Sequence, residues 1–260
     1  MAEEITLTVL GTATCTPEAG RDSSCYCVNG SLLVDAGWHV VAGLTSAGLD
    51  PLDIDALIVT HCHHDHYMGI VGLLFYLGLE GRRVPEKRFL HVYGPAGEIG
   101  RVVEDAQRFL QTDRYPELEF PVEVHDVAPG DQFTDCGLEV KAVKALHNVP
   151  SLCYRVENAS GVSVTFSGDT PFNPALVELA QGTDLLLHEM SFGPNSTRDK
   201  EGAAHSGSPE AAEVAALAGA RRLALVHGYV AAQAASLAAA QERFPATFVP
   251  REGDVLHVGG

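Results

Sequence analysis

The feature that most constrains this chain is a run of metal-binding side chains at residues 60–66. It consists of Thr60-His61-Cys62-His63-His64-Asp65-His66. An apolar segment over residues 56–59 predicts a buried strand before the run, and a glycine-rich apolar segment over residues 68–79 predicts a helix after it. Imidazole and carboxylate groups suit zinc and neighbouring divalent metals. Their close spacing favours two ions side by side over one. The alternative, a fortuitous surface cluster, would leave the other candidate ligands of the chain unexplained.

The composition is that of a globular protein. The chain has 260 residues, of which 46% are hydrophobic, and we expect a single domain over residues 1–260. No apolar run reaches the roughly 20 residues that cross a bilayer. The acidic start of the sequence lacks the pattern of a signal peptide. We therefore expect a cytoplasmic protein without a membrane partner, with its six cysteines reduced.

The charge of the chain argues against general nucleic-acid binding. Its formal net charge is −17, whereas non-specific binding depends on Lys and Arg side chains that neutralise phosphates. Residues 81–88 form the one dense basic segment of the sequence. The favoured interpretation of that segment is a solvated loop between a helix and a strand.

Strand-like patterns dominate both halves of the chain, and no linker separates the halves. We therefore expect two sheets that pack together, with helices outside them. Three further candidate ligands each follow a predicted strand: His147, Asp169 and His227. A single histidine at a strand end is usually structural. Four candidate ligand positions that all follow predicted strands, with the run at 60–66 counted as one of them, are better explained by one site at an edge of the packed sheets.

These motifs, in this order, resemble those of the metallo-β-lactamase superfamily over essentially the whole chain. The run at 60–66 matches the signature of that superfamily. The later motifs are matched by His147, Ser167-Gly168-Asp169-Thr170 and Leu225-Val226-His227-Gly228, and the N-terminal pattern by Leu10-Gly11-Thr12, Arg21 and Leu33-Val34-Asp35-Ala36-Gly37. The resemblance implies an α/β protein with an αββα fold, a four-layer sandwich of two mixed β-sheets with outer helices. It also implies a two-metal site between the sheets.

The resemblance divides the ligands between two ions. One ion is held by His61, His63 and His147, the other by Asp65, His66 and His227, and Asp169 bridges the two. A water between the ions would be acidified and would act as the nucleophile. Imidazole at position 63 favours zinc, so the expected cofactors are two Zn²⁺ ions, with Mn²⁺ as the alternative.

Two further motifs narrow the resemblance to phosphodiesterases similar to tRNase Z. They are Leu187-His188-Glu189-Met190 and Ala204-His205-Ser206-Gly207. By this resemblance Glu189 orients His205, and His205 assists the leaving group as a general acid. Asp65 both holds a metal and orients the attacking water. The alternative for His205 is that it only caps the helix that follows it.

The sequence also departs from this branch. Ser206-Gly207 stands where Ser-Thr is usual, and Gly228-Tyr229-Val230 lacks the basic residue common after the last metal histidine. The tRNA-processing enzymes carry a long arm between the third and fourth motifs, whereas only a hairpin separates His147 from Asp169 here. Together with the acidic charge, this predicts a small or cyclic phosphodiester as substrate and makes structured tRNA an unexpected one. A homodimer is implied by the resemblance alone.

Two other functions stay open. The same activated water attacks other esters, so a lactone, thioester or sulfate ester hydrolase would use the same site. A non-catalytic metal-binding carrier is the second alternative, although all the ligand positions are filled. We expect substrate specificity to reside in the loops at residues 14–23, 82–88, 112–121 and 190–204, the last of them a candidate lid.

Several side chains near the predicted site have no assigned role. His64 is interpreted as a residue at the rim of the site. Cys62, Cys25 and Cys27 are interpreted as packing residues. The alternatives are a redox-sensitive thiol at Cys62 and a structural metal held by Cys25 and Cys27, for which no partner ligands can be named.

Overall fold

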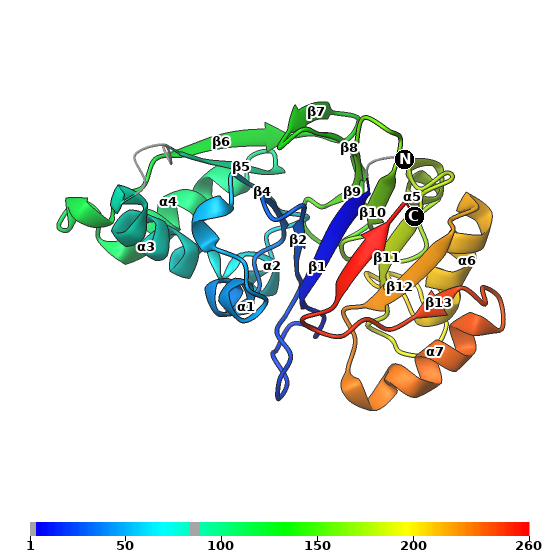
Figure 1. Cartoon of the computed structure of the whole chain (residues 1–260). Helices are drawn as coiled ribbons and strands as arrows, with labels where there is room; N and C mark the ends of the chain where they lie inside the picture. Colours follow the sequence, from blue (N-terminus) through cyan, green and yellow to red (C-terminus); the bar gives the residue numbers. More distant parts are fainter. Residues whose placement is uncertain (1–3, 84–88, 260) are drawn as a thin grey trace.

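Two mixed sheets packed face to face form the centre of the molecule (Figure 1). A computed structural model describes residues 4–83 and 89–259 of the chain. The first sheet has the strand order β14-β1-β2-β3-β4-β5-β6, and the second has the order β13-β12-β11-β10-β9-β8-β7. Each sheet combines parallel neighbours with antiparallel ones.

The strands divide between the sheets by halves of the chain, except that the last strand joins the first sheet. The first sheet contains β1 (Ile5–Gly11), β2 (Cys25–Val28), β3 (Leu32–Val34), β4 (Ala56–Ile58), β5 (Leu90–Pro95), β6 (Val122–Val127) and β14 (Val255–Val258). The second contains β7 (Gln132–Asp135), β8 (Leu138–Lys144), β9 (Leu152–Glu157), β10 (Ser163–Phe166), β11 (Leu185–Glu189), β12 (Arg222–Val226) and β13 (Thr247–Phe248).

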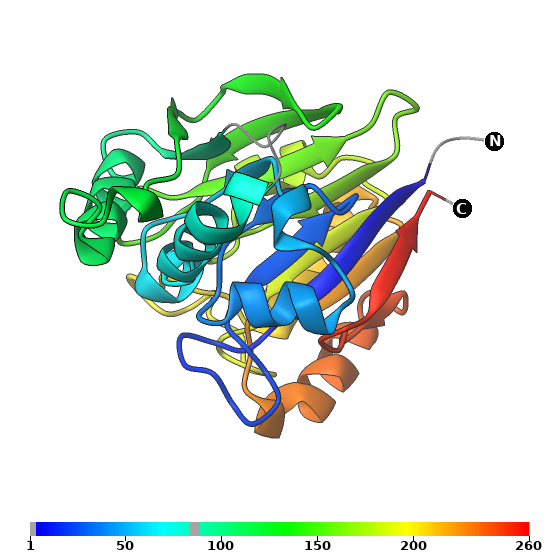
Figure 2. The same ribbon diagram turned by 60° about the vertical axis from the view of Figure 1, so that its left-hand side comes forward.

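Helices cover the outer face of each sheet (Figures 1 and 2). Over the first sheet lie α1 (Val40–Ser46), α2 (His64–Tyr67), α3 (Ile70–Glu80) and α4 (Ile99–Leu110). Over the second lie α5 (Pro174–Leu179), α6 (Ser208–Ala218) and α7 (Gln233–Gln241). The predicted four-layer αββα sandwich is therefore confirmed.

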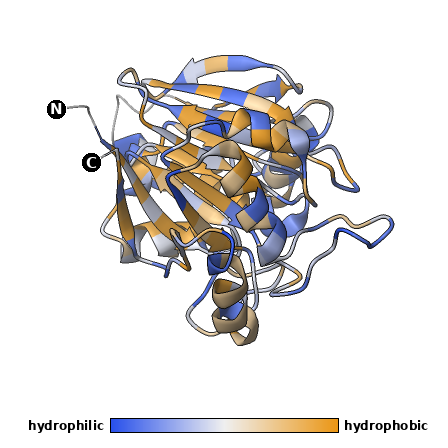
Figure 3. Cartoon of the chain, turned by 90° about the vertical axis from the view of Figure 1, so that its right-hand side faces the viewer, coloured by the Kyte–Doolittle hydropathy of each residue, from blue (hydrophilic) through white to orange (hydrophobic). Residues whose placement is uncertain are grey.

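Three apolar layers hold the sandwich together, and the strands are its most hydrophobic part (Figure 3). One buried cluster fills the space between the sheets, with Ile58 and Tyr154 among its members. A second lies between the first sheet and its helices and includes Leu57, and a third lies under α5, α6 and α7. Adjacent residues of β4 thus contribute to opposite layers, because successive strand side chains point to opposite faces. Burial on both faces explains why this strand is an unbroken apolar run.

The structure differs from the sequence-based elements in three places. The helix predicted over residues 68–79 is α3, which begins at Ile70, and the additional short helix α2 begins inside the metal-binding run, where no helix was predicted. The strand β7, between β6 and β8, has no counterpart among the predicted strands, because only Phe133 of its four partly exposed residues is apolar. The predicted basic loop at 82–88 lies largely outside the described residues.

A close backbone contact fixes the metal-binding run against the first sheet. The Gly69 N–H donates to the Ala36 carbonyl at 3.0 Å, and the Ala36 N–H donates to the His66 carbonyl at 2.8 Å. A Cβ atom placed on Gly69 would lie only 2.1 Å from the carbonyl oxygen of Gly37. Because a backbone oxygen cannot move aside cheaply, only glycine permits this approach.

No helix among the described residues is long and apolar enough to span a membrane.

Two alanine substitutions three residues apart should therefore have opposite effects. Gly69→Ala should lower the free energy of unfolding by about 1–3 kcal/mol, because the added methyl group overpacks a contact between backbones. Gly72→Ala, at a helical position where nothing lies within 4 Å of the added Cβ, should raise it by about 0.5–1 kcal/mol. Urea titration of both variants measures the difference. Equal stability of the Gly69 variant and the wild type would contradict the assigned contact.

Candidate metal centre

The ends of four strands meet in the space between the two sheets, as the sequence pattern predicted. His61 follows β4, His147 follows β8, Asp169 follows β10 and His227 follows β12. The short helix α2 adds Asp65 and His66 from its buried face. All seven predicted ligands are therefore brought together, from segments far apart in the sequence.

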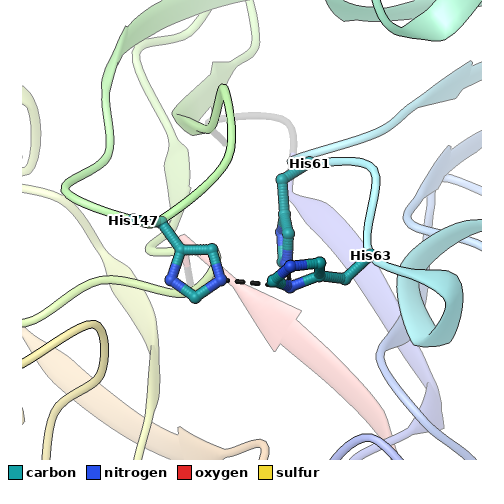
Figure 4. Close-up of side chains that lie close together, drawn as sticks. All are labelled: His61, His63 and His147. Carbon is teal, nitrogen blue, oxygen red and sulfur yellow. Dashed lines mark hydrogen bonds between the residues drawn. The ribbon is translucent and has the colours of Figure 1, made fainter.

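One group of ligands consists of three imidazoles. His61 Nε2 lies 3.1 Å from His63 Nδ1, and His63 Nδ1 lies 3.1 Å from His147 Nε2. Figure 4 shows His61 and His63 on one loop and His147 reaching toward them from another. Ligand atoms about 2.1 Å from a tetrahedral zinc ion lie about 3.4 Å apart. The spacing of the three nitrogens therefore suits one such ion with little adjustment.

A second group combines one carboxylate with two imidazoles. Asp65 Oδ2 lies 3.2 Å from His66 Nε2 and 3.2 Å from His227 Nε2. All three residues are buried. The grouping agrees with the ligand set that the resemblance assigned to a second ion.

Asp169 lies between the two groups. Its Oδ2 atom is 3.8 Å from His61 Nε2, 3.7 Å from His66 Nε2 and 3.7 Å from His227 Nε2. One oxygen at nearly equal distances from both groups is placed as a bridging ligand would be. A carboxylate there would offset the repulsion between two close cations.

The first group has the protonation state that metal binding needs. Burial, together with the neighbouring His66, lowers the pKa of His61 well below its usual value. Burial and the adjacent His147 likewise lower the pKa of His63. Both imidazoles are therefore neutral near pH 7, with lone pairs free for a cation.

The second group behaves differently when no cation is bound. Burial alone would raise the pKa of Asp65, but His227 and His66 hold that pKa below its usual range. Burial would lower the pKa of His66, yet Asp35 and Asp169 raise it well above its usual value. His66 in its charged form thus balances the carboxylates. A divalent ion would take over this task and displace the proton, as is usual for metal binding to histidine.

The donor set fits divalent metal ions. The Nε2 atom of His66 is buried and has no hydrogen-bond partner among the described residues. A buried nitrogen without a partner is costly, and here it lies 3.2 Å from a carboxylate oxygen of Asp65 and 3.7 Å from one of Asp169 without forming a hydrogen bond to either. An ion between these atoms would satisfy all of them.

The remaining nitrogen of each buried ligand histidine is held by a neighbouring group. His66 Nδ1 lies 2.7 Å from the carboxylate of Asp35, which also accepts the backbone N–H of Thr60 at 2.7 Å. His61 Nδ1 lies 3.1 Å from the Thr60 hydroxyl, and His227 Nδ1 lies 3.0 Å from the Ser191 hydroxyl. Such contacts fix the tautomer and the orientation of ligating histidines.

Sequence reasoning did not assign these supporting roles. Asp35 belongs to a matched N-terminal motif, but no role for it was predicted, and Ser191 gave no signal at all. Both Asp35 and His227 have left-handed backbone conformations, with φ of 58° and 51°. Such conformations are uncommon for residues other than glycine and are often found at functional sites.

The predicted pair of Glu189 and His205 lies beside the ligands. His205 Nδ1 is 3.1 Å from Glu189 Oε1 and 3.6 Å from Asp169 Oδ2. Burial alone would lower the pKa of His205, but the carboxylates of Glu189 and Asp169 raise it to about 9. The cap of α6 is Gly207 and not His205, whose side chain instead contacts the site.

The other residues with open roles lie at the margin or in the core. His64 is exposed, and Cys62 beside it is half-buried. Burial raises the pKa of the Cys62 thiol to about 12, so this thiol is protonated near neutral pH and weakly reactive. Cys25 and Cys27 are fully buried in the layer beneath the helices, in agreement with a packing role.

Comparison with known proteins now decides the family. A family model described as "Beta-lactamase superfamily domain" matches residues 31–228. The chain belongs to the beta-lactamase superfamily. The metal-dependent, phosphodiesterase-like type of hydrolase predicted from the motifs is confirmed at this level.

Relatives in this superfamily support the narrower resemblance. The protein named Ribonuclease Z from Myxococcus xanthus is 31% identical, with 85% of this chain and 86% of the relative covered. The structure of human tRNase Z, short form, superposes with a TM-score of 0.78 at 25% identity, covering 98% of this chain and 100% of that chain. The metallo-beta-lactamase fold protein YhfI from Bacillus subtilis has a TM-score of 0.83 at 23% identity, with 98% and 100% covered. The names Ribonuclease Z and tRNase Z conflict with the expectation that tRNA is an unlikely substrate.

The contact between Asp35 and His66 yields a test of the centre. An asparagine at position 35 would direct an N–H toward His66 Nδ1 and so favour the tautomer that carries its proton on Nε2, the ligating atom. Asp35→Asn should therefore weaken the binding of a divalent ion at His66 about 10–100-fold. Competition with a chromophoric chelator measures this affinity. The exposed Asp53→Asn serves as the matched control, and an unchanged affinity in Asp35→Asn would show that the contact does not orient the ligand.

Proposed function

We propose that this chain hydrolyses phosphodiester bonds with two divalent cations, zinc being the best match to the donor set. One ion is held by His61, His63 and His147, the other by Asp65, His66 and His227, with Asp169 between them. The observation that carries the proposal is the position of His205, which lies between Glu189 and Asp169 at the mouth of the ligand cluster. A partly exposed histidine there, beside the proposed ligands, is placed to transfer a proton.

Each residue of the site has a defined task in this reaction. Two bound cations would lower the pKa of a water molecule and neutralise charge on the phosphoryl oxygens. Asp65, whose Oδ2 faces His66 and His227, would hold one cation and orient that water with its other oxygen. Glu189 is fully buried, keeps a proton on His205 and holds the ring in place. His205 is partly exposed, so it can donate that proton to the leaving oxygen of a bound substrate.

For the substrate, we propose a small or cyclic phosphodiester. Only the β9–β10 hairpin and its flanking loops lie between His147 and Asp169, which leaves no room for a long arm there. The alignment with the Myxococcus xanthus relative extends over 276 positions, more than the 260 residues of this chain, so the relative has inserted residues that are absent here. The net charge of −17 also disfavours a polyanionic RNA.

A second candidate substrate is precursor tRNA. The names of the relatives, Ribonuclease Z and Ribonuclease BN, favour it. The same catalytic residues would serve, because the scissile bond is again a phosphodiester. The two candidates differ only in how the remainder of the substrate is held, so a direct comparison of substrates is needed.

Removal of the proposed general acid should affect substrates unequally. His205→Ala should reduce kcat about 10²–10⁴-fold for an alkyl phosphodiester, whose leaving group needs a proton. It should have a much smaller effect on bis(p-nitrophenyl) phosphate, whose leaving group is a stable anion. The alkaline limb of the pH–rate profile should also disappear, because that limb reports loss of the proton from His205. Metal content should stay at the wild-type level, and His64→Ala, at the exposed neighbour of the ligands, is the control. Equal losses on both substrates would exclude the general-acid role.

A substrate panel should separate the candidate functions. We expect turnover of bis(p-nitrophenyl) phosphate and of a cyclic nucleotide, with weaker cleavage of precursor tRNA. Faster cleavage of precursor tRNA, with release of its 3′ trailer, would favour the second candidate. A thioester and a lactone should turn over slowly, and preference for either would replace the proposal with the corresponding ester hydrolase. Full metal occupancy with no turnover of any substrate would favour a metal-binding carrier.

A further inference from the structure

A second group of metal-binding side chains lies on the first sheet, away from the proposed catalytic centre. It consists of His91 on β5 together with Glu123 and His125 on the edge strand β6. In the parallel register His91 pairs with Glu123 on one side and with Ala56 of β4 on the other. Ala56 stands five residues before His61, so at about 3.3 Å per residue this group lies roughly 15 Å from the catalytic ligands.

The three side chains share one face of the sheet. Tyr93 and Val127 belong to the apolar layer between the sheets. His91 is two residues from Tyr93, and His125 is two residues from Val127, so their side chains point to the same side. The group thus sits at the margin of the space between the sheets, where β5 and β6 extend toward β7 (Figure 1).

The ligand atoms are close enough for a single ion. His91 Nδ1 lies 3.0 Å from His125 Nε2 and 3.7 Å from Glu123 Oε2. All three candidate ligand atoms lie within 4.8 Å of one another. Atoms about 2.1 Å from a tetrahedral zinc ion lie about 3.4 Å apart, so small side-chain movements would complete the geometry.

Neighbouring aromatic rings hold the imidazoles in place. His125 stacks on Tyr93 with 4.4 Å between ring centroids, and Tyr93 stacks on Phe133 of β7 at 4.2 Å. The ring of Phe89 meets His91 edge-on at 4.8 Å. The Tyr93 hydroxyl donates to Asp135 at 2.6 Å, which ties this stack to the second sheet. A preorganised pair of imidazoles loses little freedom when it binds an ion.

A simpler explanation is a hydrogen bond between the two imidazoles. That bond accounts for the contact between the two nitrogens but gives no role to the Glu123 carboxylate, whose Oε2 lies 3.7 Å from His91 Nδ1. Two imidazoles and a carboxylate together are a common donor set for zinc, with a fourth position left for water. The side chain of Glu123 is 54% exposed, so an ion and its water could enter from solvent.

We propose that His91, Glu123 and His125 form a third divalent-metal site, with Zn²⁺ as the ion that fits best. A bound ion would link the edge strand β6 to β5. Most side chains of β6 are exposed or half-buried, so the hydrophobic effect contributes little to holding this strand on the sheet. The ion therefore acts as a cross-link at the margin of the first sheet and takes no part in hydrolysis.

The test is a Zn²⁺ titration of the holoprotein with both catalytic ions in place. The wild type should bind one further equivalent, seen by mass spectrometry of the native protein, and its Tm should rise as that equivalent binds. Glu123→Gln and His125→Gln should each lose the further equivalent and the accompanying rise in Tm. Both variants should keep wild-type hydrolytic activity, because neither residue belongs to the catalytic centre.

The control is His257→Gln, a strand histidine that faces a single carboxylate, Glu4, at 3.2 Å. This variant should bind as much Zn²⁺ as the wild type. The proposal is wrong if the wild type binds no further equivalent, or if the Glu123 and His125 variants retain it. It is also wrong if His257→Gln loses the equivalent, because the binding would then be that of scattered surface histidines. The near-isosteric Glu123→Gln on an exposed side chain keeps the fold, so the comparison does not depend on the His125 variant alone.

Discussion

The buried carboxylate of Asp35 is the contact on which the metal centre most depends. It follows β3, accepts the backbone N–H of Thr60 at the end of β4, and holds His66 of α2. Three elements that are separate in the sequence are therefore fixed by one side chain. The close contact between Gly69 and the backbone of Ala36 and Gly37 also holds the C-terminal end of α2 against the loop that follows β3. Without these contacts of Asp35 and Gly69, the metal-binding run would be a flexible loop, and its histidine side chains would not converge on one site.

The crowded ligands explain why the site is suited to cations. Buried imidazoles and carboxylates within 4 Å of one another are tolerated only if the charges balance. In the absence of metal, protonated His66 supplies the positive charge that Asp35, Asp65 and Asp169 require. Divalent cations bound among these side chains would supply that charge and leave the imidazoles neutral. The carboxylates of Glu189 and Asp169 raise the pKa of His205 to about 9, although burial opposes this shift.

Much of this arrangement could be predicted from sequence, for identifiable reasons. Apolar strands that end in a histidine or an aspartate are visible as local patterns, and their order along the chain matches a known superfamily. The strand β7 was missed because Gln132 and Asp135 give it no alternating apolar pattern. The support from Asp35 and Ser191 arises only from packing, since polar residues that contact ligands look like any loop residue. The stacked site at His91 and His125 was also missed, because it depends on the register between β5 and β6.

The order of the ligands along the chain has a consequence for biosynthesis. The residues His61, His63 and His147 have all been synthesised once the strand β8 and the loop after it are made, whereas the other group must wait for His227, near the end of the 260 residues. Domains generally fold as units. Because β14 pairs with β1 and His227 follows β12, neither the first sheet nor the full ligand set exists until nearly the whole chain has been made. The candidate centre is therefore completed only late in synthesis, when the last strands of both sheets are in place.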